Sequence, residues 1–218
     1  MSSRSLQTTK SFLALLLTVS LLVTANLRAD DPQEVSLMTP GSPNLGWSFD
    51  NGQEFPGATG SVAIDPDHQR EGHDMLILKG DFSAGGAYVR ANVPIPNVDI
   101  DKLTFWLRSP NSDLVTVRLL DSAGECHQFK IRATLGTSWD RVIFPVADYF
   151  EGMKPNKRQS VTNVIGYETW GGPNDKTWHG PAKSLDILLG PTPLEKVVSL
   201  GIGDVTVTVK PPPTPASP

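Results

Sequence analysis

The chain has 218 residues, a formal net charge of −4 and a single cysteine. This acidic balance excludes nucleic-acid binding through a basic footprint, because phosphate contacts need clustered Lys and Arg. One cysteine excludes an intrachain disulfide, so an exported domain of this composition must be stabilised by its core or by a bound metal.

The first 29 residues have the features of a secretory signal peptide. Arg4 and Lys10 precede an apolar run over residues 12–23, and cleavage is expected after Ala25 or Ala29. The run is shorter than the roughly 20 residues that span a bilayer, although an uncleaved membrane anchor is the alternative. We therefore expect a secreted or periplasmic protein without a transmembrane segment after cleavage. Cleavage would remove basic residues but no acidic one.

Composition divides the rest of the chain into three parts. Residues 30–44 contain Pro, Gly and Ser with little periodicity, and we expect an exposed lead-in there. Residues 211–218 are a proline-rich tail, which is expected to be extended and solvated. The region between them, residues 45–210, is long enough for one domain with a hydrophobic core.

Short segments of strand character separated by turns fill the central region. With 19 glycines and 19 prolines, no segment keeps a 3.6-residue apolar period over three turns, which argues against helices. Residues 121–124, Asp-Ser-Ala-Gly, are a good hairpin turn. About nine antiparallel strands at this spacing predict an all-β fold, a β-sandwich of the jelly-roll type. The expected strands are residues 62–64, 75–78, 87–93, 103–108, 114–120, 128–133, 140–144, 185–189 and 204–209.

Alternation along these strands separates an apolar from a polar set of side chains. The apolar set, such as Val89, Ala91 and Val93, is expected to form the core. If the strands are neighbours in one sheet, the polar set forms an outer face with aromatic rings and forked hydrogen-bond donors. Sugars fit such a face, because a pyranose stacks its C–H side on a ring and its hydroxyls bind planar polar groups. The set is Tyr88, Arg90, Asn92, Trp106, Arg108, Arg118, Gln128, Lys130 and Arg132.

Two further points concern this polar set. Its cations, on an otherwise acidic protein, favour an anionic glycan as the ligand. An ordinary solvated sheet face, with Trp106 under a loop, would have the same composition and is the alternative. An open groove around Trp106 would favour sugar binding, and a flat or covered face there would count against it.

A second cluster lies in the Gly- and Pro-rich residues 166–181, which hold Trp170 and Trp178. Large aromatic side chains on a surface loop indicate a contact that covers them, and one such contact is stacking on a ligand. The alternative is that the loop folds back and closes one end of the sandwich, which fits Trp178 somewhat better. The polar partners of a ligand in this loop would be Asn174, Asp175 and His179.

No catalytic constellation stands out in the sequence. The four histidines do not form a zinc-peptidase motif, and Cys126 and His127 are adjacent on a strand, so they point to opposite faces. The enzyme alternative is a jelly-roll polysaccharide lyase or hydrolase, in which Arg neutralises a uronate and Tyr or His moves a proton. The side chains available to it are Tyr88, Arg90, Arg118, Gln128 and Lys130.

Seven short segments between residues 47 and 209 occur in a familiar order and spacing. They are residues 47–52 (WSFDNG), 54–60 (EFPGATG), 79–82 (KGDF), 103–108 (LTFWLR), 118–128 (RLLDSAGECHQ), 138–142 (SWDRV) and 200–205 (LGIGDV). In these segments the chain resembles the galactose-binding-domain-like β-sandwiches, which include many carbohydrate-binding modules of bacterial glycoside hydrolases.

The resemblance implies a non-catalytic module that binds an extracellular polysaccharide. It also implies a structural calcium between the first strand, the following loop and the last strand, with Asp50 or Glu54 and Asp204 as ligands. Calcium prefers such oxygen ligands and is plentiful outside cells. Glycan binding is the expected function, and the alternatives are the lyase or hydrolase described above and an extracellular protein-interaction module. The residues expected to contact the glycan are Tyr88, Arg90, Asn92, Trp106, Arg108, Arg118, Gln128, Lys130, Trp170, Asn174, Asp175 and Trp178.

Overall fold

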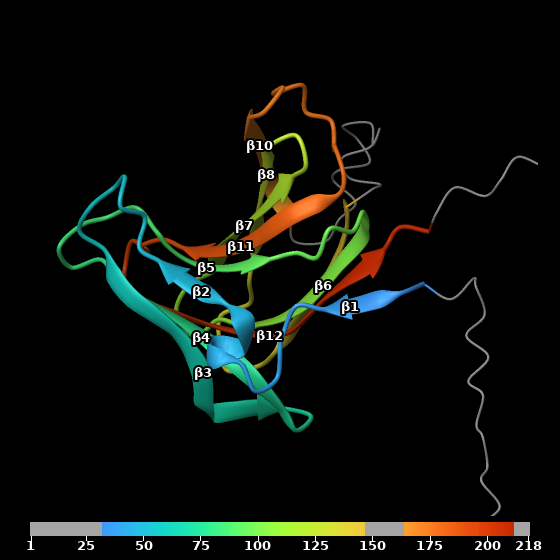
Figure 1. Ribbon diagram of the computed structural model, residues 1–218. Coiled ribbons are helices and arrows are strands. Elements are labelled where there is room, and N and C mark those ends of the chain that lie inside the picture. Colours follow the sequence, from blue (N-terminus) through green and yellow to red (C-terminus); the bar gives the residue numbers. More distant parts are fainter. Residues whose placement is uncertain (1–31, 147–163, 212–218) are drawn as a thin grey trace, which may run out of the picture. The chain divides into compact units, whose positions relative to one another are not determined.

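The computed structural model describes residues 32–146 and 164–211. These residues form twelve strands in two sheets of six, and the named strands pair only in antiparallel fashion. The two sheets lie face to face around one hydrophobic core (Figure 1). The predicted all-β sandwich is confirmed, with twelve strands instead of about nine. The predicted signal peptide, residues 1–29, and residues 212–218 of the predicted tail lie outside the described residues.

The first sheet is built around the long strand β12 (Val197–Val209). One half of β12 pairs with β4 and the other half with β6, and β1 adds to β12 near its end. The order of its other strands around β12 is β3 (Thr59–Arg70), β4 (His73–Asp81), β12, β6 (Ile100–Arg108) and β9 (Asp140–Pro145), with β1 (Glu34–Ser36) beside β12.

The second sheet contains the β7–β8 hairpin, whose turn lies at the predicted residues 121–124. Gly124 has a φ of +83°, which a glycine adopts without strain, so the chain can reverse there. The order of strands is β10 (Val164–Gly171), β8 (Glu125–Arg132), β7 (Leu114–Asp121), β11 (Ala182–Leu189), β5 (Val89–Pro94) and β2 (Ser48–Asp50).

The core forms where the apolar sides of both sheets meet. Val115, Val117 and Leu119 of β7 are completely buried, as the alternating pattern predicts. Phe129 of the second sheet stacks on Phe144 of the first, with ring centroids 3.8 Å apart and an interplanar angle of 2°. Direct stacking between the sheets shows that the two apolar faces form one core.

The segment predicted to be an exposed lead-in, residues 30–44, is mostly exposed where the structure describes it, but residues 34–36 form a strand and Leu37 and Met38 are buried. Backbone pairing of β1 with β12 adds a strand, and Leu37 and Leu45 are buried. The short 3-10 helix η1 (Pro43–Gly46) follows, and the Trp47 indole donates a hydrogen bond to the Leu37 carbonyl at 2.9 Å. The composition is loop-like, but these few apolar side chains cover the edge of the core, and this stabilises the segment. Within the described ranges, no helix combines the length and apolarity needed to cross a membrane.

Two other strands escape the sequence pattern. Strand β2 has three residues, and β10 lies in a segment expected to be a loop. Glycines at both ends of β10 hide its alternation, yet it pairs with β8 over Val164–Gly171. Consequently Trp170 lies on a strand and not on a free loop.

Candidate functional site

The outer face of the second sheet, called the polar face below, gathers polar side chains from neighbouring strands. Register aligns Gln128 with Arg118, Arg118 with Asp186, and Asp186 with Asn92. Glu168 of β10 extends this row, because it pairs with Gln128. Seven members of the predicted polar set lie on or beside this face: Tyr88, Arg90, Asn92, Arg118, Gln128, Lys130 and Arg132.

Aromatic rings and one guanidinium group form a continuous line of contacts on the polar face. The Arg118 guanidinium carbon is 5.0 Å from the ring centroid of Tyr88 and 5.2 Å from that of Trp170. Phe55 meets Tyr88 edge to face, with centroids 6.3 Å apart. Phe55 and Trp170, the two ends of this stacked row, are 52% and 40% exposed, whereas Tyr88 is buried. The row therefore offers aromatic surface to solvent at both ends.

Hydrogen bonds hold the planar groups of this face in fixed orientations. Arg118 Nε donates to Gln128 Oε1 at 2.8 Å, and Gln128 Nε2 donates to Glu168 Oε2 at 3.2 Å. Lys130 Nζ lies 3.5 Å from the other oxygen of Glu168. Such groups lose little further side-chain entropy when they bind a ligand.

Carboxylates pair with Arg90 and Lys130 on the polar face, while the Arg118 guanidinium binds the Gln128 amide. Arg90 lies between Asp186 and Asp50, with nitrogen–oxygen distances of 3.1 and 3.3 Å. Asn92 also donates to Asp186, and Glu168 faces Lys130. The face has no excess of positive charge, so the cations in the sequence pattern do not indicate an anionic ligand.

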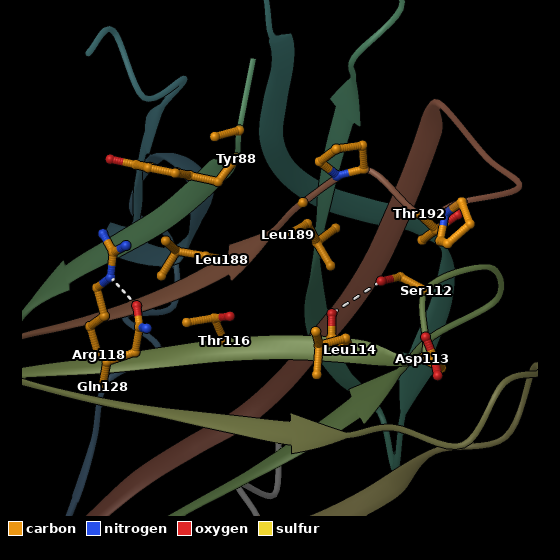
Figure 2. A pocket seen from close by; sticks show the side chains of 14 residues that line it. Tyr88, Ser112, Asp113, Leu114, Thr116, Arg118, Gln128, Leu188, Leu189 and Thr192 are labelled. Carbon is orange, nitrogen blue, oxygen red and sulfur yellow. Dashed lines mark hydrogen bonds between the residues drawn. The ribbon is translucent and has the colours of Figure 1, made fainter. Parts of the chain in front are cut away.

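A pocket of about 260 Å³ opens beside the stacked row. Figure 2 shows Arg118 and Gln128 at one end of it, Ser112 and Thr192 at the other, and Tyr88 along one side. Its lining combines apolar atoms, hydroxyls and planar polar groups, which is the mixture that small polar ligands need. The pocket thus gives the polar face a concave part.

Burial and hydrogen bonding set the protonation of groups around the row. Burial, and then the hydrogen bond to Glu54, raise the pKa of Tyr88. The same bond, donated by the Tyr88 hydroxyl, is the main cause of a lowered Glu54 pKa. On the same face, burial raises the pKa of the Cys126 thiol to about 12. None of these shifts brings the pKa of Tyr88, Glu54 or Cys126 toward neutral pH.

Trp106 and Arg108 do not lie on the polar face. Both belong to β6, which pairs with β12 and β9 in the first sheet. Arg70 covers Trp106, with its guanidinium carbon 3.7 Å from the ring centroid, and Arg108 is buried against Asp65. The alternation along β6 was correct, but strand order separates its polar side chains from those of β5, β7 and β8. Trp106 is thus half-buried under Arg70 of β3, whereas the alternative expectation placed it under a loop.

Of the three ligand candidates in residues 172–181, one is buried and two are exposed, and the burial of Trp178 agrees with the alternative in which the loop closes the end of the sandwich. Trp178 is 4% exposed, lies edge to face against His127, and donates to Asp99 at 3.1 Å, so it fills the end of the sandwich. Asn174 and Asp175 are exposed on the turn after β10. The backbone N–H of Asp175 donates to Glu125, which directs this turn toward the start of β8.

The carboxylates expected to bind calcium do not form a common site. Asp50 accepts from the Gly52 N–H and Arg90, Glu54 accepts from Tyr88, and Asp204 binds Arg70 and His73 on the first sheet. Among the described residues, the group that could hold a metal ion is Glu125, Asp175 and His179. A calcium bound jointly by Asp50, Glu54 and Asp204 does not fit this arrangement.

Several contributors to the polar face were not predicted. Asp186 looked like part of an apolar strand, but it is the shared acceptor of Arg90 and Asn92. Phe55 appeared in the sequence only within residues 54–60, one of the segments that carry the family resemblance, and the structure brings it against Tyr88. An acidic residue within an otherwise apolar strand, as in residues 185–189, was the available signal for Asp186.

Comparisons with known proteins show likeness in fold. No family model and no curated protein matches the chain. A family 11 carbohydrate-binding module of the cellulosomal cellulase Lic26A-Cel5E of Clostridium thermocellum is similar at 14% identity and a TM-score of 0.55, over 83% of this chain and 96% of that one. The structure of the agarase AgWH50C is similar at 14% sequence identity and a TM-score of 0.49, over 83% of this chain and 26% of that one. A CBM4 structure is similar at 14% sequence identity and a TM-score of 0.44, over 79% of this chain and 97% of that one.

The likeness to the family 11 module shows the fold of this chain and nothing finer. Its identity to this chain is too low to transfer a ligand or a residue role, but nearly its whole length is covered. The predicted resemblance is therefore confirmed for the fold, and the chain has the β-sandwich fold of a carbohydrate-binding module.

Proposed function

We propose that this protein is an exported, non-catalytic polysaccharide-binding module and that the polar face is its binding surface. The observation that carries the proposal is the stacked row of Phe55, Tyr88, Arg118 and Trp170 beside the pocket. Export is inferred from residues 1–29 of the sequence.

The exposed ends of the row have the chemistry that sugar rings need. Trp170 and Phe55 present aromatic surface, on which the C–H side of a pyranose stacks. Between them, Arg118 and Gln128 offer planar donors and acceptors in orientations already fixed by their mutual hydrogen bond. The row crosses several strands, so it suits a chain of sugars better than a single one.

Charge balance favours a neutral polysaccharide. Arg90 is paired with two carboxylates and Lys130 with Glu168, so an acidic sugar would compete with ion pairs that are already formed. Neutral hydroxyls can instead share these groups, because carboxylates accept and guanidinium groups donate.

The same geometry gives less support to the lyase alternative. A lyase would use Tyr88 as its base, but burial raises the pKa of Tyr88 and its hydroxyl donates to Glu54. Calcium at Asp50, Glu54 and Asp204 is not part of the proposal, since those carboxylates bind Arg90, Tyr88, Arg70 and His73 instead.

The test is binding of the protein to an array of neutral and acidic polysaccharides. Wild type is expected to bind neutral members, and Trp170→Ala and Phe55→Ala are expected to weaken that binding. Trp106→Ala is the matched control, because Trp106 also stacks on an arginine but lies on the first sheet. Absence of glycan binding by the wild type, or equal losses in Trp106→Ala and Trp170→Ala, would overturn the proposal.

A further inference from the structure

Three side chains at one end of the second sheet bring their ligand atoms together. Glu125 begins β8, and Asp175 and His179 lie between β10 and β11, with one ligand atom of each lying within 4.8 Å of the others. The backbone N–H groups of Asp175 and Lys176 donate to the two oxygens of Glu125, at 3.2 and 2.9 Å. Glu125 points away from the polar face, because it alternates with Cys126. The cluster is thus separate from the proposed glycan site.

Asp121 determines the direction of the His179 ring. Asp121 Oδ2 accepts from the His179 backbone N–H at 3.0 Å and lies 3.2 Å from Nδ1, so we assign the ring hydrogen to Nδ1. The other ring nitrogen, Nε2, then faces Asp175 Oδ2 at 3.3 Å. Two acceptor atoms at this distance need a positive charge between them, which is either a proton on Nε2 or a metal ion bound to both.

Two buried carboxylates beside the ring lack a basic partner of permanent charge. Asp121 and Glu125 are both 0% exposed. In the described part of the chain, neither forms an ion pair with Lys or Arg, and the ion-pair partners of Asp121 are His127 and His179. Buried carboxylates are costly unless they are paired or bind a metal. A divalent cation on Glu125 would supply the missing charge.

From these two observations we infer that Glu125, Asp175 and His179 form a zinc site. Zn²⁺ accepts imidazole nitrogen and carboxylate oxygen and is often held by three protein ligands and a water. The 3.3 Å between His179 Nε2 and Asp175 Oδ2 is compatible with two bonds of about 2.0 Å to one tetrahedral ion. Asp121 behind the imidazole is the outer partner that zinc-binding histidines characteristically have.

The donor set discriminates against calcium. Calcium takes about six to eight oxygen ligands, whereas this cluster presents one nitrogen and two carboxylates. Zinc here would join the start of β8 to the loop before β11. Its role is therefore structural, as a clamp on a loop in a domain that lacks disulfides.

Metal titration of the tag-free protein, stripped with EDTA and dialysed, tests this inference. We expect calorimetry to detect one Zn²⁺ per chain and Zn²⁺ to raise the midpoint of thermal unfolding, while Ca²⁺ leaves it unchanged. Co²⁺ substitution should produce visible d–d absorption without thiolate charge transfer, because Cys126 points to the other face. No saturable Zn²⁺ binding, or a larger shift with Ca²⁺ than with Zn²⁺, would overturn it.

Variants locate the site. Asp175→Asn is the safest, because Asp175 is exposed and asparagine keeps an acceptor for the Thr177 N–H. Asp175→Asn and His179→Gln should each lower Zn²⁺ affinity by at least about tenfold. His73→Gln is the control, since His73 binds Asp204 on the first sheet. If the folded variants at Asp175 and His179 bind Zn²⁺ as tightly as wild type, the ion lies elsewhere and the assignment fails.

Discussion

Arginine lies against tryptophan on the outer faces of both sheets, but the surroundings of the two pairs differ. On the first sheet Arg70 covers Trp106 at 3.7 Å and binds Asp204, while Arg108 is buried with Asp65. On the second sheet Arg118 lies 5.2 Å from the ring of Trp170, which is 40% exposed beside a pocket. Both faces contain the same residue types, but Trp106 is half-buried under Arg70, whereas Trp170 is exposed beside the pocket.

The difference comes from the far end of the β3–β4 hairpin. Asp65 and His68 from β3 contact Arg108, and Arg70 contacts Trp106. The hairpin thus supplies side chains that bind Arg108 and pack on Trp106. On the second sheet Arg118, Gln128 and Glu168 hydrogen-bond one another within the face, and Trp170 stays exposed beside them. Side-chain identity alone therefore does not distinguish a binding face from a covered one.

The largest expected effect is on stability and belongs to the first sheet. Arg108→Ala leaves the buried Asp65 carboxylate without its guanidinium, and breaking a buried pair in this way costs about 3 kcal/mol. Denaturant unfolding measures this loss. Arg132→Ala, which breaks an exposed pair with Asp113, is the control and should change stability by less than about 1 kcal/mol. Similar losses in the two variants would show that the first-sheet pair is not a buried structural unit.

The next effect is on binding and belongs to the second sheet. Arg118→Lys keeps the charge but removes the planar group between Tyr88 and Trp170, so glycan affinity should fall about tenfold, or about 1.4 kcal/mol. Calorimetry with a polysaccharide found on the array measures this. Arg70→Lys makes the same change on the first sheet and should leave glycan affinity unaltered. If Arg70→Lys lowers the affinity and Arg118→Lys does not, the glycan binds the first sheet and not the second.

The buried Asp65 carboxylate of the first sheet should make the stability of the protein depend on pH. Burial would raise the pKa of Asp65, but hydrogen bonds from the Asp67 N–H, His68 and Arg108 outweigh it and lower that pKa below 3.8. The stabilisation is complete above the unfolded-state pKa and is lost as pH falls through the folded-state value. The stability gap between wild type and Asp65→Asn should therefore narrow on acidification below about pH 4. A gap that stays constant down to pH 2 would contradict this assignment.

The smallest expected effect is that of Trp106→Ala. Its contact with Arg70 is a cation–π pair at a partly exposed site, and losing the pair costs about 1 kcal/mol. Thermal unfolding should register a small decrease, and glycan affinity should not change. A measurable loss of affinity in this variant would mean that the first sheet also binds ligand.

Much of the polar face could be predicted from the alternation of apolar and polar residues along single strands. Arg118 and Gln128 lie on facing strands of one hairpin, so period-two reading and a turn signal suffice to bring them together. Strand order is not local, and β6 belongs to the first sheet only because it pairs with β12, about a hundred residues later in the chain. Trp106 was therefore assigned to a face that it does not reach.

Other features depend on contacts that no local pattern encodes. β10 was missed because Gly166 and Gly171 interrupt its alternation, although pairing with β8 stabilises it. The cluster of Glu125 and His179 joins residues more than fifty positions apart, and the sequence shows only a single histidine and two acids. Such constellations require the register of the sheet and the path of the loop after β10.

The five tryptophan indole N–H groups give the most direct test of which sheet binds glycan. In a titration of the ¹⁵N-labelled protein followed by NMR, the Trp170 indole resonance should shift with added polysaccharide and saturate. Those of Trp106 and Trp139, on the first-sheet side, should stay in place. Saturable shifts of Trp106 or Trp139 with an unchanged Trp170 would contradict the account.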